Sequence, residues 1–307
     1  MSKGDLPQGT EARAAMLLAR EGGTGGLPGL AFVPRRYRPT AIAGLLTPGI
    51  AVMTVGFLTP LAIALWTSLH GAGGWSIDAY MALAGSTLFW RVMSGTFQIA
   101  LLSSIAALLL GYPLALHMSQ RSPKVRRVLM MLVLIPFWTS ILVKSYAFIV
   151  LFGREGLLNQ ALRAWYFPFG PLDLMFNRTG VGIAMAHQVI PFVVFPLLTS
   201  MLQVDRNVYR AAEIMGASPY TIFWRVTLPL TLPGAAAAFL IAFTLGLGAY
   251  ITPALLGGRR DLMIANLIDF RLRETLDWPA ASAIAITLTG LVCALIALAR
   301  RVSRPQH

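Results

Sequence analysis

Charge and sulfur are scarce in this sequence of 307 residues. Only 12% of the residues are Asp, Glu, Lys or Arg, and the single cysteine, Cys293, lies in a late apolar run. One cysteine excludes a disulfide within the chain and any metal site built from several thiolates. Hydrophobic residues make up 56% of the chain and the mean hydropathy is +0.68. These values predict a protein of the lipid bilayer rather than an ordinary water-soluble domain.

Several catalytic and nucleotide-binding patterns are also missing. No G-x-x-x-x-G-K-[ST] phosphate loop is present, so the chain has no P-loop for ATP. Neither HExxH nor G-x-S-x-G occurs, which argues against a membrane hydrolase. The net charge of +13 does not indicate a nucleic-acid partner, because the basic residues lie between long uncharged stretches rather than on one polar face. We expect this chain to bind no metal and no cofactor.

Long apolar runs are what the sequence has in quantity. A hydrocarbon core about 30 Å thick needs about 20 apolar residues in a helix. Open sheets are excluded in a bilayer, and the alternating pattern of a barrel is absent. We therefore predict an all-α, integral membrane helical bundle of six transmembrane helices. The spans are expected at residues 45–69, 97–119, 128–152, 181–204, 233–256 and 280–299.

The basic residues predict an orientation for these spans. With a cytoplasmic N-terminus, the inner connections hold 16 of the 25 Lys and Arg residues, which places the C-terminus in the cytoplasm as well. The first 44 residues have no apolar run long enough for a signal peptide, so we expect a retained tail there. The expected organisation is this cytoplasmic tail at 1–44, the first span and its outer loop at 45–90, a membrane domain at 91–300 and a cytoplasmic tail at 301–307.

A polar loop between the fourth and fifth spans, residues 205–233, is predicted to form two short helices around a break. Gly216 is the residue best able to adopt the left-handed conformation after a helix end. Ser218 is a good N-cap and Pro219 suits the first helical position, so a second helix should begin at once. A partner could approach the backbone closely over the small side chains of this loop. An amphipathic helix lying on lipid headgroups is the alternative, and composition leaves the two interpretations about equal.

The end of this loop is marked by two prolines. The second helix is expected to end before Pro229, and the fifth span is expected to begin at Pro233 with Gly234.

The same loop resembles a known motif. The pairs and triplets Ala211-Ala212, Gly216-Ala217-Ser218, Leu228-Pro229 and Pro233-Gly234 are similar, at the family's spacing, to the EAA loop of binding-protein-dependent ABC importer permeases. In that family the loop fits into a cleft of the ATPase subunit. Arg210 is a departure, because the family has a glutamate there, and the nearest acid is Glu213. The resemblance implies a type-1 ABC importer permease fold and a set of ATPase-coupling residues, namely Arg210, Ala211, Ala212, Glu213, Gly216, Ala217, Ser218 and Pro219.

Two further stretches resemble polyamine permeases of the spermidine and putrescine type. Residues 136–147 with 153–159 are similar to the third span and its outer loop, and residues 252–258 to the end of the fifth span. The resemblance covers about residues 91–300 and implies a multi-pass protein of the bacterial inner membrane. It also implies ABC ATPase subunits that bind ATP-Mg, a second permease subunit and an extracytoplasmic solute-binding protein as partners.

Other transport roles remain as alternatives. The solute could be an opine, another amine, an amino-acid-like solute or an inorganic ion. An ion-coupled secondary transporter is less favoured, because such proteins ordinarily place carboxylates within their spans and none lies in the six stretches.

Lys144 is the single Lys, Arg, Asp or Glu residue predicted well inside a span. A central lysine costs about 2.5 to 3.5 kcal/mol in a membrane helix, so it should face protein or water. Because a cationic solute would not bind it directly, we favour a structural or gating role. His187 in the fourth span is expected to make an interhelical hydrogen bond. The candidate pathway residues are Trp138, Tyr146, Phe148, Tyr250 and Thr252, although packing is the commoner role of aromatic residues in spans.

Overall fold

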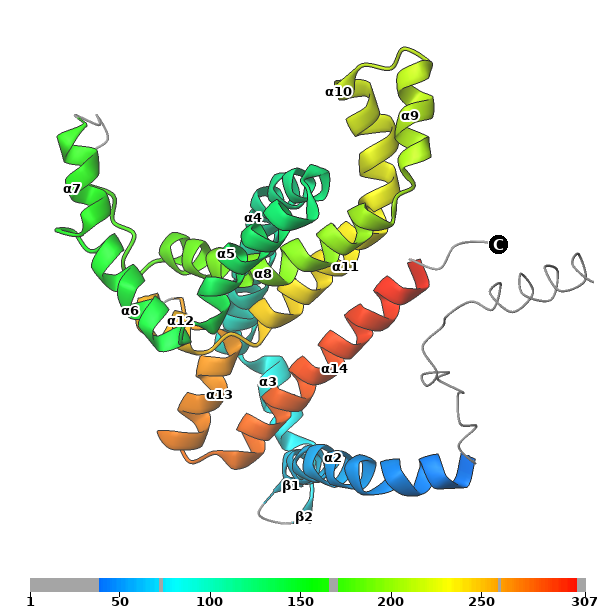
Figure 1. The fold of residues 1–307 in the computed structure, drawn as a ribbon. Coiled ribbons are helices and arrows are strands. Elements are labelled where there is room, and N and C mark those ends of the chain that lie inside the picture. The colour runs from blue at the N-terminus through cyan, green and yellow to red at the C-terminus, as the bar shows by residue number, and fades with distance from the viewer. Residues whose placement is uncertain (1–38, 72–73, 166–170, 259–260, 303–307) are drawn as a thin grey trace, which may run out of the picture. The chain divides into compact units, whose positions relative to one another are not determined.

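The structure is a computed structural model that describes residues 39–71, 74–165, 171–258 and 261–302 (Figure 1). Most of the expected N-terminal tail and residues 303–307 of the expected C-terminal tail lie outside the described residues. The elements in chain order are α2 (Pro39–Ser68), β1 (His70–Gly71), β2 (Gly74–Trp75), α3 (Asp78–Gly85), α4 (Thr87–Gln120), α5 (Pro123–Trp138), α6 (Ile141–Phe152), α7 (Leu157–Ala164), α8 (Arg178–Gln203), α9 (Arg206–Ile214), α10 (Pro219–Ile222), the π-helical turn η1 (Phe223–Thr227), α11 (Leu228–Leu247), α12 (Ile251–Leu256), α13 (Ile264–Arg273) and α14 (Trp278–Val302).

The chain divides into two compact units, Met1–Phe57 and Leu58–His307. In the first unit the structure describes the beginning of α2, which starts at Pro39 and so is longer than the predicted span. The second unit contains the end of α2 and all the other elements. Its only sheet among the described residues is an antiparallel hairpin in which His70 pairs with Trp75.

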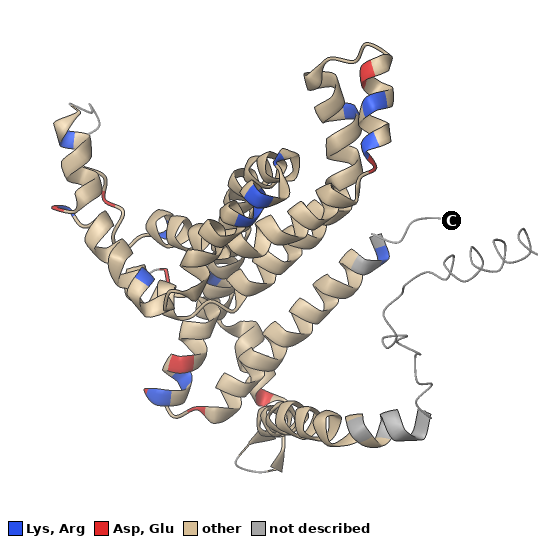
Figure 2. Cartoon of the chain, viewed as in Figure 1, with Lys and Arg blue, Asp and Glu red and all other residues tan. Residues whose placement is uncertain are grey.

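Membrane-spanning helices dominate the described part of the chain. Five helices in the described part of the chain are long and apolar enough to cross a membrane: α2, α4, α8, the run from α10 to α11, and α14. The pair formed by α5 with the segment 141–164 is bent by 90° and makes a sixth if it is counted as one span. Lys, Arg, Asp and Glu lie mainly near the ends of the long helices and in the connections (Figure 2). The predicted all-α membrane bundle is therefore confirmed.

Three long helices form the centre of the second unit. Helices α4, α8 and α11 pack together through small and branched side chains that are fully buried, including Ala107, Val193, Leu197 and Ala238. The helices approach closely because glycine stands at a contact: a Cβ on Gly246 would lie 3.1 Å from the Cβ of Ala100. Such small residues let membrane helices gain dispersion contacts where apolar burial adds little. Ala235, Ala238 and Ala242 of α11 therefore pack within the subunit, whereas Ala236 and Ala237 are exposed.

Two of the smaller clusters attach other helices to this centre. Leu83 of α3, Phe89 of α4, Ile264 of α13 and Ile284 of α14 form one of them. The other joins Phe152 of α6 to α8 and α12. These clusters attach the short helices to the ends of the long ones.

The third predicted span, residues 128–152, is wrong as a single helix. Helix α5 ends at Trp138 and α6 begins at Ile141 after the extended residues Thr139 and Ser140. The Thr139 hydroxyl donates to the carbonyl of Ile135 at 3.1 Å, in keeping with the rule that freed backbone acceptors in a membrane must find donors.

The predicted start of the fifth span at Pro233 is also wrong. The helix runs on from Pro219 through η1 and α11 to Leu247. The π-turn explains how Pro229 is accommodated: the N–H of Leu228 bonds to the carbonyl of Phe223, five residues back, just before the proline that lacks an N–H. The predicted end is corrected as well, because α12 is a separate short helix.

Candidate functional site

Helix α9 begins the loop that carries the predicted coupling residues. The side chain of Asp205 caps it by accepting the N–H of Asn207 at 2.9 Å. Ala212 is buried on the inner side of the helix, whereas Arg210 and Ala211 are exposed. Arg210 therefore faces outward, and the second of the two alanines faces the protein itself.

The predicted break at Gly216 is confirmed. Gly216 has φ +77°, a left-handed conformation that side chains disfavour. The N–H of Ala217 bonds to the carbonyl of Ala212 at 3.0 Å, and that of Gly216 bonds to the carbonyl of Glu213 at 2.9 Å. This pair of bonds is a Schellman motif, which satisfies the last carbonyls of the helix.

The second helix starts as the sequence predicts. The Ser218 hydroxyl accepts the N–H of Thr221 at 3.3 Å, and Pro219 occupies the first helical position. The two short helices are thus separated by a turn of fixed geometry.

The tip of this loop presents apolar side chains. Ile214, Met215 and Tyr220 are 86%, 79% and 74% exposed, and Trp224 is half exposed. The predicted approach surface consists of the small alanine side chains, and Ile214, Met215 and Tyr220 are not among the predicted residues. The sequence did contain a signal for these residues. Large apolar side chains directly before the glycine of a polar loop have no neighbouring helix face within the loop that could cover them. We call Ile214, Met215 and Tyr220 the apolar tip.

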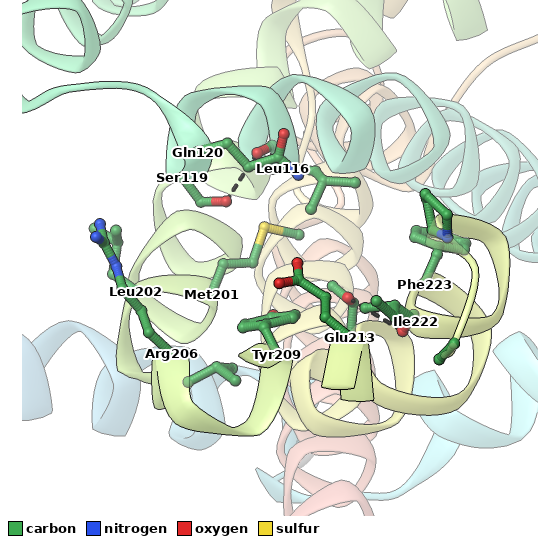
Figure 3. A pocket seen from close by; sticks show the side chains of 14 residues that line it. Leu116, Ser119, Gln120, Met201, Leu202, Arg206, Tyr209, Glu213, Ile222 and Phe223 are labelled. Carbon is green, nitrogen blue, oxygen red and sulfur yellow. Dashed lines mark hydrogen bonds between the residues drawn. The ribbon is translucent and has the colours of Figure 1, made fainter. Parts of the chain in front are cut away.

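A cavity of about 710 Å³ lies on the inner side of the loop. It is lined by the ends of α4 and α8 together with α9, α10 and η1 (Figure 3). Glu213 and Tyr209 reach it from α9, and Met201 reaches it from α8. The short helices therefore have unfilled space between them and the bundle.

The loop carries more positive than negative charge. Arg206, Arg210 and Arg225 stand against Asp205 and Glu213. No ion pair joins any of these five residues to another described residue within the chain. Their charges are thus available to a partner surface.

The aromatic candidates for a solute pathway do not form one cluster. Trp138, Tyr146 and Tyr250 are 81%, 59% and 41% exposed, and they come from α5, α6 and the residue before α12. The ring of Phe148 instead packs edge-on against His187, with centroids 5.5 Å apart. The role of these aromatic residues in a solute pathway stays a prediction. It would involve side chains that no other part of this subunit covers.

Thr252 belongs to a buried polar cluster that joins three helices. Its hydroxyl accepts the Nε2 amide of Gln188 of α8 at 2.6 Å and lies 3.3 Å from the hydroxyl of Ser145 of α6. Ser145 and Thr252 are almost completely buried. The interhelical hydrogen bond expected of His187 is therefore made by the neighbouring residue Gln188. The Nδ1 atom of His187 is buried and has no hydrogen-bond partner among the described residues.

Lys144 lies in the first turn of α6, just after the break from α5. Its ammonium group donates to the carbonyl of Pro136 at 3.0 Å. This carbonyl is near the carboxyl end of α5, where a cation is favourable. The contact supports the structural role that the sequence predicts for Lys144.

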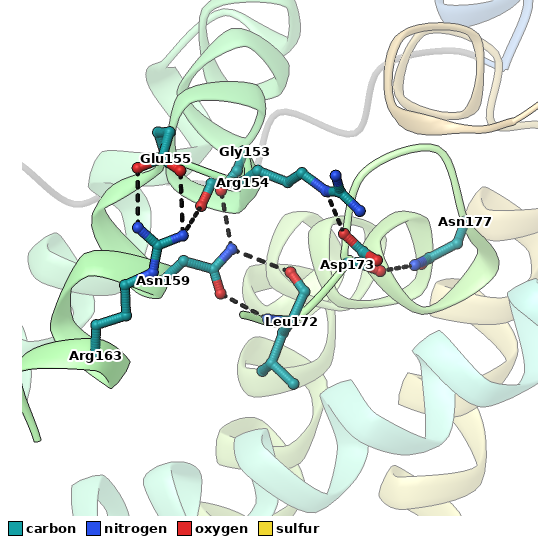
Figure 4. Close-up of polar contacts among 8 residues, drawn as sticks. All are labelled: Gly153, Arg154, Glu155, Asn159, Arg163, Leu172, Asp173 and Asn177. Carbon is teal, nitrogen blue, oxygen red and sulfur yellow. Dashed lines mark hydrogen bonds and ion pairs between the residues drawn. The ribbon is translucent and has the colours of Figure 1, made fainter. Parts of the chain in front are cut away.

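Charged residues order the connection around α7 (Figure 4). Arg163 donates to both carboxylate oxygens of Glu155, at 3.0 and 3.1 Å, and Arg154 pairs with Asp173 at 3.0 Å. These hydrogen bonds and the charge of each arginine lower the pKa of both carboxyl groups below their ordinary values.

The buried amide of Asn159 joins the two ends of this connection. It donates to the carbonyls of Gly153 and Leu172, at 3.0 and 3.1 Å, and accepts the N–H of Leu172 at 2.7 Å. All of its main hydrogen-bonding positions are thus used for structure.

A bundle of apolar helices with a glycine-broken pair of short helices defines a membrane permease subunit, a transport component rather than an enzyme. A model of the family described as "Binding-protein-dependent transport system inner membrane component" matches residues 107–305. The chain belongs to this family, whose permease subunits serve ABC importers.

Two similar proteins and one solved structure place the chain among its relatives. It is 32% identical over 229 residues to the spermidine/putrescine transport system permease protein PotB of Escherichia coli (strain K12), covering 75% of this chain and 83% of that protein. It is 30% identical over 269 residues to PotB of Haemophilus influenzae, covering 85% and 89%. A chain in the crystal structure of a bacterial alginate ABC transporter, in complex with an alginate pentasaccharide-bound periplasmic protein, matches with a TM-score of 0.73 at 19% identity, covering 86% and 93%. The fold is the type-1 ABC importer permease fold.

Proposed function

We propose that this chain is one of two permease subunits of an ATP-driven importer of polyamines such as spermidine and putrescine. The observation that carries the coupling role is the loop at residues 205–233, where a Schellman-terminated helix presents an exposed apolar tip above a cavity. A soluble surface of this kind is expected to be covered by another protein.

The partner at this tip is an ABC ATPase subunit that binds ATP-Mg. Ile214, Met215 and Tyr220 enter its cleft, and the exposed Arg210 lies at the rim of the contact. Closure of two ATPase subunits around ATP moves the loop, and the bundle then exposes its pathway to the other side of the membrane. This chain contributes no phosphate loop of its own.

The remaining partners follow from this arrangement. The loop and both chain ends face the cytoplasm of a bacterial cell, in keeping with the excess of Lys and Arg in the connections on that side. A second permease subunit completes the pathway and covers the exposed aromatic side chains Trp138 and Tyr146. An extracytoplasmic solute-binding protein delivers the solute to the opposite face.

The likeness to PotB supports polyamines as the solute. Lys144 does not contradict a cationic solute, because its ammonium group is engaged with Pro136 rather than aimed into a cavity that a solute would occupy. Aromatic faces bind organic cations, and Trp138, Tyr146 and Tyr250 expose such faces.

Uptake by the whole complex tests the proposal. Proteoliposomes that contain this chain, its partner permease, the ATPase and the binding protein should accumulate labelled spermidine or putrescine only when ATP is supplied to the ATPase side. Uptake of an opine, an amino acid or an inorganic ion instead would retain the permease function and overturn the substrate. Ion-driven uptake by this chain alone would overturn both.

Crosslinking tests the docking of the apolar tip. The native cysteine is exposed, so it is first replaced by serine in Cys293→Ser. Met215→Cys in that background should form crosslinks with the ATPase subunit, because Met215 is 79% exposed at the tip. Met81→Cys in α3, 65% exposed, is the matched control that should not. Equal crosslinking at both positions, or none at Met215, contradicts the docking.

A further inference from the structure

The link between the loop and the bundle is a single π-turn. Residues Phe223 to Thr227 form η1, which joins the short helix α10 to the long helix α11 without a break. A π-turn contains one residue more than the α-helical repeat, so its backbone carbonyls are less regularly paired. Pro229 extends this irregularity, because it has no N–H to donate to Arg225.

A directed chain of hydrogen bonds holds this turn against α4. The Thr231 hydroxyl donates to the carbonyl of Thr227, the last residue of the π-turn, at 2.7 Å. The Tyr112 hydroxyl lies 2.7 Å from the same Thr231 oxygen. Because a hydroxyl has one proton and a carbonyl can only accept, Tyr112 must be the donor to Thr231. The chain therefore runs from Tyr112 of α4 through Thr231 of α11 to the turn.

These groups lie in a setting where a hydrogen bond matters. Thr231 is fully buried, so water is not a ready substitute for the hydrogen bonds of its hydroxyl. The ring of Phe223, the first residue of the turn, meets the ring of Tyr112 edge-on with centroids 5.9 Å apart. Tyr112 thus contacts the first residue of η1 directly and reaches the last residue through Thr231.

We propose that Tyr112 and Thr231 are positioning residues that transmit movement of the coupling loop to α4. This proposal rests on the proposed function of the loop. The cavity under the loop, which Phe223 and Thr227 help to line, leaves α9 and α10 room to move. With the hydroxyl chain intact, the π-turn and α4 move together. Without the hydroxyl chain, the π-turn absorbs the motion, because its backbone carbonyls exchange their hydrogen-bond partners.

Conservative variants of the intact importer test this role. Tyr112→Phe removes the donor and keeps the ring, and Thr231→Val removes the central hydroxyl and keeps the shape. We expect each variant to transport about threefold to tenfold less spermidine per ATP hydrolysed, as the loss of one neutral hydrogen bond predicts. The double variant should be no worse than the worse single variant, because both changes break the same chain.

Two controls separate this role from general stability. Thr231→Ser keeps the hydroxyl and should keep the wild-type ratio. Tyr80→Phe removes a hydroxyl that bonds to Ser68 at 2.8 Å, away from the loop. This variant should also transport as much solute per ATP hydrolysed as the wild type. A merely structural role for Tyr112 would lower the amount of assembled complex without changing solute transported per ATP.

A second readout does not depend on the solute. Spin labels at Val208→Cys in α9 and Val125→Cys in α5, in the Cys293→Ser background, report the ATP-driven change in distance between the loop and the bundle. Tyr112→Phe should change that distance response, and Thr231→Ser should not. If wild-type complex transports no spermidine, the substrate proposal fails while this measurement still decides the present one. An unchanged distance response and an unchanged transport ratio in Tyr112→Phe would overturn it.

Discussion

The ammonium group of Lys144 donates to the carbonyl of Pro136 at 3.0 Å and so joins the two helices on either side of a 90° bend. The carbonyl lies in the last turn of α5, where the following residues leave the helix. A lysine in a membrane span is costly, and its presence requires a polar partner. Here the partner is a backbone group that itself lacks a helical donor.

Replacing this lysine should loosen the bend. Lys144→Met leaves the Pro136 carbonyl without its donor, and an unsatisfied acceptor of this kind costs about 1 to 3 kcal/mol. We expect a lower midpoint of thermal unfolding in detergent. Lys144→Arg can still donate and should retain most of the stability, and the exposed Lys124→Met is a neutral control. A variant Lys144→Met with unchanged stability and an altered KM would assign the residue to substrate contact instead.

The glycine between the two short helices should tolerate no side chain. Because φ is +77° at Gly216, Gly216→Ala costs about 1 to 2 kcal/mol of left-handed strain, and Gly216→Val costs more. The Schellman bonds are then expected to break and the angle between α9 and α10 to change. ATP-dependent transport should fall while membrane insertion persists.

Gly182→Ala provides the control for that experiment. Gly182 is helical and a Cβ there meets nothing within 4 Å, so alanine should be neutral or stabilise the helix by up to about 1 kcal/mol. Normal transport by Gly216→Val would contradict the coupling role of the break.

Local chemistry explains which parts of the site the sequence predicts. The helix end at Gly216 and the restart at Ser218 and Pro219 depend on residues within a few positions of one another, so their pattern is readable without the fold. The apolar runs similarly predict the membrane bundle, because bilayer thickness fixes their length.

The parts that the sequence misses depend on distant residues. The bend after Trp138 is stabilised by the hydrogen bond from Lys144 and by the packing of α6 on α12 around Ser145 and Thr252. The π-turn before Pro229 is held by Tyr112, more than a hundred residues away along the chain. A proline such as Pro229, considered without the fold, predicts that the helix ends before it. In the structure, tertiary contacts allow the helix to continue past the proline. The exposed tip likewise required knowing which face of α9 the bundle covers.

Acid should weaken the contact between α7 and the residues before it. Arg163 holds the pKa of Glu155 below its ordinary value of 4.5, mainly through hydrogen bonding. A lowered pKa in the folded state means that the pair stabilises the segment above about pH 4.5 and loses this effect as the pH falls through the lowered pKa. Hydrogen exchange of residues 153–163 should therefore be faster at about pH 3.5 than at neutral pH after correction for the intrinsic rate. Glu155→Gln should remove that pH dependence, and a persistent dependence in this variant would assign it to another group.

Close packing between α8 and α11 makes Gly234 sensitive to a single methyl group. A Cβ at this position would overlap the Cβ of Ser200, so it could be accommodated only if the helices moved apart. Gly234→Ala is therefore expected to destabilise the bundle by about 1 to 3 kcal/mol, the usual cost of overpacking. Ser200→Gly removes the opposing atom, so the double variant Gly234→Ala/Ser200→Gly should recover most of the lost thermal stability. Gly248→Ala, where a Cβ meets nothing within 4 Å, is the matched single control. Equal unfolding midpoints for Gly234→Ala and the double variant would show that a clash with Ser200 is not what destabilises Gly234→Ala.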